Sequence, residues 1–375
     1  MNIINFNTEK SNCFSQLILD YFDNKFVSSH NVNNNFNEKI SNNLWEIAEK
    51  NIAEGKTTAI NQLKISFPQL NFPIDNEICD NEDYKKATTK GDFTEINFSE
   101  NTLKLQNPHN ISLSVYPSFT GHIPVLKIDN AIDFEKIIQA LLHKNKPVTI
   151  PRSMGAALIN GINNWDKIKK LQRNWANSNS IQNTWNEEFK YNILPYPHLY
   201  KDRIIIISNK PYSNVHSSEL YLEQNDWLNL SETIRIEHEC THLYTLIKYG
   251  CASNNLHDEI IADYIGIKKT GNNYNIDWML TFFGLENYPN YREGARLQNY
   301  IQNIELDSPD FKDLLSIVKN AILNIKSFDK GIQQSSINIP LIIDTLCQTS
   351  VLDIASKDGA KMLHEKYYSL KNYQH

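Results

Sequence analysis

Apolar residues at helical spacing dominate the stretch Ser231–Ile267. Ile236, Cys240, Leu243 and Ile247 follow one another at intervals of four, three and four residues. Residues at these intervals share one side of an α-helix, so the four side chains form a stripe that can pack against a core. The pattern predicts an amphipathic helix whose apolar side is buried.

Polar residues and glycines mark the ends of this predicted helix and of the next one. Asn229 is placed to cap the first helix, and Glu232 follows three residues later, as in a capping box. Gly250 comes after the last apolar residue of the stripe, where many helices end in a left-handed conformation. A second helix is predicted to begin near Asn255 and to end at Gly271.

Shorter patterns precede these helices. Asp202–Ser208 contains four consecutive isoleucines, which predicts a central strand that is buried on both faces. Ile123–Ile128 predicts another strand, Ala131–His143 a helix and Pro147–Ile150 a short strand. Pro151–Ala157 is typical of a loop that leads into a helix.

The two ends of the chain are also rich in helical patterns. Within residues 1–75 they occur at Asn12–Phe22 and Asn37–Ala53, and short β-like runs follow at Phe93–Phe98 and Thr102–Leu105. The remaining helical segments are Asn163–Trp175, Ile276–Gly284, Tyr291–Ile304, Pro309–Ile325, Ile339–Ala355 and Lys357–Tyr373.

Composition and charge narrow the class of protein. The chain has 375 residues, of which 41% are hydrophobic, enough for a core in one large domain or in two or three smaller ones. A net charge of −6 gives no support for nucleic-acid binding, and no apolar run is long enough to span a bilayer. Five scattered cysteines without C-x-x-C pairs, and an N-terminus without signal-peptide features, predict a cytoplasmic protein with reduced thiols.

Candidate chemistry lies in the first predicted helix, where His238, Glu239 and His242 belong to an H-E-x-x-H sequence. Histidines four residues apart lie on the same helical face and can both point at one ion. Neutral imidazoles suit zinc, and Glu239 can reach a zinc-bound water and take its proton. Both histidines fall outside the apolar stripe, on a side expected to face a cleft.

The second predicted helix offers further ligands, because Glu259 and Asp263 are again four residues apart. On the same side, Ala262 and Gly266 are small enough to let this helix approach the first one closely. Here the sequence resembles the gluzincins, the thermolysin-like and related zinc metallopeptidases, whose second helix carries an E-x-x-x-D arrangement. By that resemblance Glu259 is the third zinc ligand, and Asp263 accepts a hydrogen bond that fixes the tautomer of a ligand histidine.

Two neighbours of Glu259 are alternative third ligands. Asp258 and His257 would point about a third of a turn or more away from Glu259 on the helix. Sixteen residues separate His242 from Glu259, which leaves a short connection between the two helices. The sequence alone does not separate zinc from cobalt or manganese.

The resemblance covers residues 231–267 and implies an α+β, zincin-like fold. Such a fold has a small mixed sheet, an active-site helix and a mostly helical C-terminal subdomain. We therefore expect an N-terminal α+β region of unknown role at 1–120, a zincin-like metal-binding core at 121–270 and a helical C-terminal subdomain at 271–375.

The resemblance also implies where a substrate would bind. In zincins an edge strand beside the metal helix aligns a peptide by main-chain pairing, and residues 212–218 are the candidate strand, with His216 either a contact or a surface residue. A donor from the C-terminal half would stabilise the oxyanion. The candidates are Tyr291, Arg292 and Arg296, and Arg292 can instead pair with an acidic neighbour on the surface.

These features predict a zinc-dependent hydrolase, with a metallopeptidase that acts on a peptide or protein substrate as the favoured activity. A metal-dependent hydrolase of another amide or an ester would use the same residues. A non-catalytic interaction protein that retains a zincin scaffold is the alternative from another class. Glu239 argues against that alternative, because a structural metal site does not need a base there.

Overall fold

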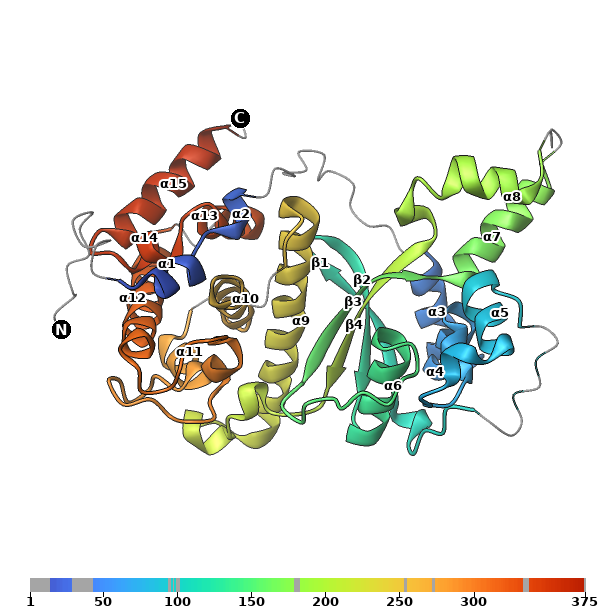
Figure 1. Cartoon of the computed structure of the whole chain (residues 1–375), viewed down its shortest axis with the longest axis horizontal. Helices are drawn as coiled ribbons and strands as arrows, with labels where there is room; N and C mark the ends of the chain where they lie inside the picture. Colours follow the sequence, from blue (N-terminus) through green and yellow to red (C-terminus); the bar gives the residue numbers. More distant parts are fainter. Residues whose placement is uncertain are drawn as a thin grey trace. The chain divides into compact units, whose positions relative to one another are not determined.

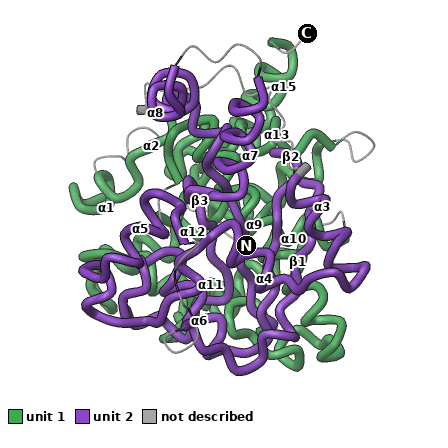
Figure 2. The backbone as a smooth tube through the Cα atoms, turned by 90° about the vertical axis from the view of Figure 1, so that its right-hand side faces the viewer, with its two compact units in different colours: residues 1–39, 210–375 green, residues 40–209 purple. Residues whose placement is uncertain are grey.

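The computed structural model describes residues 14–28, 43–93, 96, 98, 102–178, 183–252, 255–271, 274–332 and 337–373. Its contacts divide the chain into two compact units (Figure 2). The first unit comprises residues 1–39 and 210–375, and the second comprises residues 40–209. The second unit is therefore inserted into the sequence of the first.

This division differs from the three parts expected from the sequence. The predicted core at 121–270 is split between residues 209 and 210, and neither residue 120 nor residue 270 is a boundary. The difference arises because long-range contacts group the strands with the helices that precede them, and the metal-site helices with those that follow.

The second unit is built on a four-stranded mixed sheet with strand order β1-β2-β4-β3 (Figure 1). β1 (Ser112–Ser118) pairs antiparallel with β2 (Gly121–Ile128), and β2 pairs parallel with β4 (Lys201–Ser208). β3 (Ala156–Asn163) pairs antiparallel with the other side of β4. The predicted central strand is confirmed, because β4 has a neighbour on each side and Ile204–Ile207 are fully buried.

Three helices share a hydrophobic core with alternate residues of this sheet. They are α3 (Asn43–Ala53), α4 (Ala59–Ser66) and α6 (Ala131–Leu142). The core includes Trp45, Leu63, Ile137, Ile204 and Ile206. The predicted helix at 131–143 is thus confirmed, with Asn130 as its cap. The other helices of this unit are α5 (Glu82–Lys90), α7 (Trp165–Ala176) and α8 (Trp185–Glu188).

Three local predictions in this unit are wrong. Pro147–Ile150 is irregular, and Pro151–Ala157 leads into strand β3 instead of a helix. Ala156 and Ala157 pair with Ile207 and Ile206, so the ladder with β4 overrides the local helix preference of the alanines. Thr102–Leu105 is irregular as well, and Phe93–Phe98 lies largely outside the described residues.

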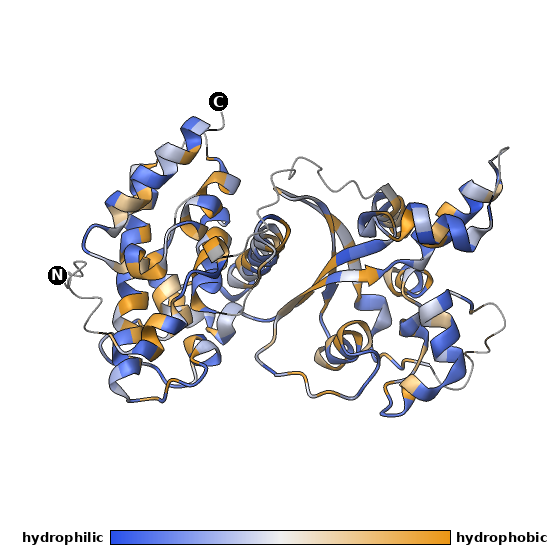
Figure 3. Cartoon of the chain, turned by 45° about the horizontal axis from the view of Figure 1, so that its top comes forward, coloured by the Kyte–Doolittle hydropathy of each residue, from blue (hydrophilic) through white to orange (hydrophobic). Residues whose placement is uncertain are grey.

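The first unit is helical in its described residues. α9 packs against α10, α12 contacts α11, α14 and α15, and α13 contacts α10 and α15. Figure 3 shows these helices banded in hydrophobic and hydrophilic colours, as expected of amphipathic helices around a core. Their bounds are α1 (Gln16–Tyr21), α2 (Lys25–Ser28), α9 (Gln224–Tyr249), α10 (Leu256–Lys269), α11 (Ile276–Phe283), α12 (Pro309–Gly331), α13 (Ile339–Cys347), α14 (Val351–Ala355) and α15 (Gly359–Tyr373).

Helix α9 is longer than predicted. It begins at Gln224 with Glu223 as N-cap, so Asn229 lies inside the helix and is not its cap. The extension is held by Trp227, which is buried and donates a hydrogen bond through Nε1 to the carbonyl of Val215. The predicted end is confirmed, because Gly250 is the C-cap in a left-handed conformation with φ of 67°.

Helices α9 and α10 approach each other at Gly266, as the small residues predicted. A Cβ on Gly266 would lie 2.8 Å from the carbonyl oxygen of Ile234, closer than side-chain carbons come to such an oxygen. Asn255 caps α10 by accepting a hydrogen bond from the amide of Asp258. The start of α10 and its distance from α9 are therefore fixed by residues that the sequence pattern singled out.

The segment before α9 is not a strand. Tyr212–Asn214 and Ser217–Leu220 form short 3₁₀ turns, with Ser213 and Asn214 at φ of 53° and 55°. The prediction of an edge strand at 212–218 is therefore wrong, since a strand requires extended φ and ψ at these positions. Another short 3₁₀ helix, η9 (Arg296–Tyr300), is the regular element within the predicted helical segment Tyr291–Ile304.

Across the described ranges, no helix combines the length and the apolar character needed to cross a membrane. The overall class is mixed α and β, with a small four-stranded sheet and mostly helical content, as predicted.

Candidate metal centre

The two histidines of the H-E-x-x-H sequence converge on one point. His238 and His242 lie one turn apart on α9, and their Nε2 atoms are 2.8 Å from each other. Cys240 and Leu243, from the predicted apolar stripe, are fully buried on another side of the helix. The helix therefore separates a packing face from a face that carries both imidazoles.

Glu259 completes a three-residue cluster from the neighbouring helix. Its Oε2 lies 3.5 Å from Nε2 of His238, and its Oε1 lies 3.6 Å from Nε2 of His242. One candidate ligand atom from each residue falls within 4.8 Å of the others. The structure thus brings together the three predicted metal ligands, in an arrangement of two nitrogen donors and one oxygen donor.

Each histidine has a carboxylate behind it. Asp263 Oδ1 lies 2.8 Å from Nδ1 of His238, as predicted, and Asp258 Oδ2 lies 2.7 Å from Nδ1 of His242. A carboxylate at Nδ1 holds the proton there and leaves Nε2 as the donor toward a metal. In both histidines it is Nε2 that lies toward the other members of the cluster.

The alternative third ligands have other roles in the structure. Asp258 orients His242 and does not compete with Glu259 for the centre. His257 points elsewhere, with Nε2 3.0 Å from the carbonyl of Leu346, and burial lowers its pKa to about 4. The E-x-x-x-D pattern could not reveal the role of Asp258, because that role depends on which side of α9 the helix α10 meets.

The electrostatic field of the cluster favours a cation. Burial alone would lower the pKa of His242, but the carboxylates of Asp258, Glu259 and Glu239 outweigh burial and raise it to about 10. Glu239 itself is half-buried and follows His238 directly on α9. The negative potential that raises this pKa would also favour a metal ion, which would have to displace the proton of His242.

Arg296 reaches the cluster from η9. Its Nη1 lies 2.8 and 2.9 Å from the two carboxylate oxygens of Asp263, and its Nη2 contacts Oε2 of Glu259. Burial would raise the pKa of Asp263, but Arg296 and His238 hold it at about 2. Arg296 is therefore the one of three oxyanion candidates that the structure places at the site.

The other two oxyanion candidates lie elsewhere. Tyr291 donates a hydrogen bond through Oη to the carbonyl of Ala295. Arg292 binds Glu286 and the carbonyl of Thr281, which is the surface pairing expected as its alternative. Neither residue contacts the histidines or the carboxylates of the cluster in these interactions.

Tyr212 is a site residue that the sequence did not reveal. Its Oη donates to Oδ1 of Asp263 at 2.5 Å, accepts from Nη1 of Arg296 at 2.6 Å and lies 3.0 Å from Nδ1 of His238. Burial raises the pKa of Tyr212 well above its ordinary value. Its neighbour His216, the candidate substrate contact, is exposed.

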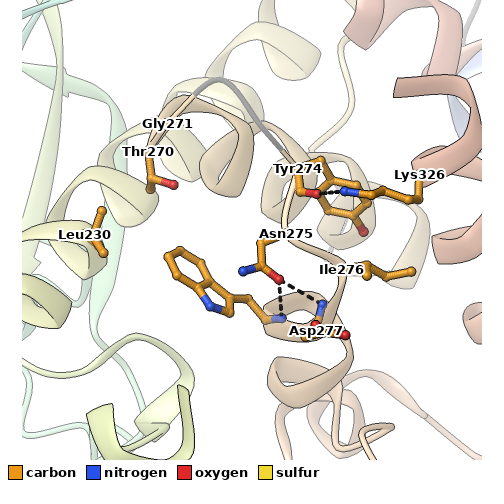
Figure 4. A pocket seen from close by; sticks show the side chains of 9 residues that line it. Leu230, Thr270, Gly271, Tyr274, Asn275, Ile276, Asp277 and Lys326 are labelled. Carbon is orange, nitrogen blue, oxygen red and sulfur yellow. Dashed lines mark hydrogen bonds between the residues drawn. The ribbon is translucent and has the colours of Figure 1, made fainter. Parts of the chain in front are cut away.

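A cavity of about 430 Å³ lies in the same unit but away from the cluster (Figure 4). Asn275 caps α11 there by accepting hydrogen bonds from the amides of Asp277 and Trp278, and Lys326 donates to the carbonyl of Tyr274. Thr270, on its wall, is eleven residues from Glu259 along α10 and its cap, roughly 16 Å at 1.5 Å per residue. The cavity is therefore not part of the histidine and carboxylate cluster.

Comparison with known proteins places the chain in a family without assigning an activity. No curated protein and no solved structure matched the chain. A family of unknown function, DUF7005, matched residues 3–358, a range that includes all the residues of the cluster. This match covers most of the sequence, and the chain belongs to the DUF7005 family.

Proposed function

We propose that this chain is a zinc-dependent hydrolase and that its favoured substrate is a peptide bond. The observation that carries the proposal is the convergence of His238, His242 and Glu259 beside Glu239. Two histidines and one carboxylate are typical of catalytic zinc sites, which keep a position open for water, whereas structural sites are closed by four protein ligands. As part of this proposal, the chain is related to the gluzincins and its two metal-site helices are arranged as in zincins.

The residues present fit a divalent metal. The donors are two imidazole nitrogens and one carboxylate oxygen, a set that suits zinc better than magnesium or calcium. Glu239, Asp258, Glu259 and Asp263 contribute four carboxylates, against the single guanidinium of Arg296. A dication would offset most of the remaining negative charge.

Bound zinc would supply a Lewis acid for the scissile carbonyl and lower the pKa of a water molecule. Glu239 accepts the proton of the attacking water and returns it to the leaving amine. Asp263 and Asp258 hold His238 and His242 in the tautomer that presents Nε2. We propose a cytoplasmic location for this activity, in line with the scattered cysteines.

Metal content is the first test. Purified protein should contain about one zinc per chain. His238→Ala should lose the zinc, whereas His216→Ala, which changes an exposed histidine outside the cluster, should retain it. A wild-type protein that neither contains nor takes up zinc would overturn the proposal.

Catalysis needs a second test. Glu239→Gln should keep zinc and fold but lower the rate of peptide cleavage by about 10²- to 10⁴-fold, because it removes the proton acceptor. Cleavage of a peptide library, read by mass spectrometry of new termini, gives the rate. Glu223→Gln on the exposed N-cap of the same helix is the matched control. Equal rates for Glu239→Gln and wild type would remove Glu239 from the mechanism.

The same variants separate the alternatives. If zinc is bound but no peptide is cleaved, model amide and ester substrates should distinguish another metallohydrolase from a non-catalytic protein. Loss of ester or amide hydrolysis in Glu239→Gln would identify the former.

A further inference from the structure

Two like charges are buried side by side on α10. Glu259 and Asp263 are four residues apart, one helical turn, and both are less than 5% exposed. Carboxylates at this spacing repel each other, and burial strengthens the repulsion because water no longer screens it. Their arrangement therefore requires a cation that contacts both.

Arg296 meets that requirement. Its Nη1 is paired with Asp263, and its Nη2 with Glu259, so one planar guanidinium spans the two carboxylates. A lysine ammonium is a point charge and lacks the two-pronged geometry that such a bridge needs.

The guanidinium is itself held in place. Nε of Arg296 donates to Oη of Tyr300 at 3.1 Å, and Nη1 donates to Oη of Tyr212. The loop that precedes η9 is closed by the bond from the amide of Arg292 to the carbonyl of Gly284. At Gly284, with φ of 74°, a Cβ would lie 2.4 Å from Cβ of Ala295, so the loop is packed against itself immediately before Arg296.

The contact with Glu259 is selective for one oxygen. Nη2 of Arg296 contacts Oε2 and lies 3.5 Å from Nε2 of His238, which is also 3.5 Å from Oε2. Oε1 has no such contact with Arg296 and lies 3.6 Å from Nε2 of His242. A carboxylate with one oxygen engaged by a guanidinium has the other oxygen available as a metal ligand.

We infer that Arg296 is a positioning residue that restricts Glu259 to one ligating oxygen, an inference that rests on the proposed metal site. With Oε2 bound to Arg296, the metal receives two nitrogens and one oxygen from the protein, and a fourth position stays open for water. Without Arg296, both oxygens of Glu259 can bind the metal and fill that position. The positive charge of Arg296 also weakens metal binding.

Cobalt provides the test, because four-coordinate Co²⁺ absorbs visible light more strongly than five- or six-coordinate Co²⁺. Wild-type protein loaded with Co²⁺ alone should show the strong absorption. Arg296→Met should show weaker absorption and should bind Co²⁺ more tightly, by about tenfold, once the repelling charge is removed. Arg292→Met, in the same loop but bound to Glu286, should match wild type in both measurements.

The opposite results overturn the inference. A merely structural Arg296 would leave a looser site, and Arg296→Met would then bind Co²⁺ about 10- to 100-fold more weakly. Wild-type absorption in Arg296→Met would equally show that Glu259 does not gain a ligating oxygen.

Two other outcomes are also informative. If Arg296→Met does not fold, the wild-type spectrum decides. Strong four-coordinate absorption supports the inference, and weak absorption, from a site with five or six ligands, overturns it. Failure of wild type to take up Co²⁺ or zinc at all would instead contradict the proposed function, so the two failures are distinguishable.

Discussion

Helix α10 carries two buried charge clusters that differ in their balance of charge. Near its start, Glu259, Asp263 and Asp258 face two histidines and a single arginine. Near its end, Lys268 forms an ion pair of 2.6 Å with Asp329, and Oη of Tyr264 donates to the same carboxylate oxygen at 2.6 Å. The second cluster contains one charge of each sign, whereas the first has more carboxylates than cations.

The difference separates a structural cluster from a candidate binding site. A lone pair of opposite charges, each hydrogen-bonded, needs no further ion when it is buried. An excess of buried carboxylates is costly unless a cation neutralises it, so we propose that the first cluster is arranged to bind a cation that the chain does not supply. The two clusters share a helix and similar burial, but they differ in charge balance and in the presence of two histidines.

The largest effect is expected on stability, at the second cluster, where Lys268 and Asp329 balance each other's charge. Lys268→Met should leave Asp329 buried without its partner and lower the free energy of unfolding by about 3–5 kcal/mol. Urea denaturation measures this loss. Zinc affinity should stay within about twofold of wild type, because Lys268 lies in the last turn of α10, beyond the carboxylates of the first cluster.

A double variant is the control for this prediction. Replacing both partners, Lys268→Met with Asp329→Leu, should recover most of the lost stability. A large drop in zinc affinity in Lys268→Met would contradict the separation of the two clusters.

Removing a carboxylate from the first cluster should change zinc affinity more than it changes the stability of the fold. Asp263→Ala and Asp258→Ala should each weaken zinc binding by about 10- to 100-fold, because each leaves one histidine without the group that orients it. Competition with a chromogenic chelator measures the affinity. If Asp258→Ala binds zinc as tightly as wild type, its contact with His242 has no role in the metal site.

The smallest expected effect is at Tyr212. Tyr212→Phe keeps the ring but removes the hydroxyl that donates to Asp263 and accepts from Arg296. Zinc affinity should fall by less than about tenfold, because Asp263 and Arg296 still contact each other directly and a hydrogen bond is worth roughly 1 kcal/mol. Isothermal calorimetry can resolve a change of this size. A loss as large as that of Asp263→Ala would mean that Tyr212 orients His238 directly.

The parts of the site that sequence could predict are those set by helical geometry. His238 and His242 are one turn apart, as are Glu259 and Asp263, so their relative directions follow from the helix alone. The approach of the two helices followed from Gly266, and the start of α10 from Asn255. These features depend on neighbours within a few residues.

The parts that sequence did not predict depend on distant contacts. Tyr212 reaches Asp263 from a turn with left-handed residues, in a segment for which the zincin resemblance implied an edge strand. Arg296 could be named as a candidate, but its choice over Arg292 depends on the path of the loop after α11. In the sheet, β3 forms because residues such as Ala157 pair with partners such as Ile206, 49 residues away. Local propensity does not take such distant partners into account.

The inserted arrangement of the two units has a consequence for synthesis on the ribosome. Residues 40–209 are contiguous, so this unit can fold as soon as it has emerged. Helices α1 and α2 are synthesised before this unit, yet their partners include α12 and α9, which are synthesised much later. The nascent chain must therefore carry these two helices without their partners until α9 and α12 have emerged. The metal-site residues, all beyond residue 210, are assembled only after the second unit has been translated.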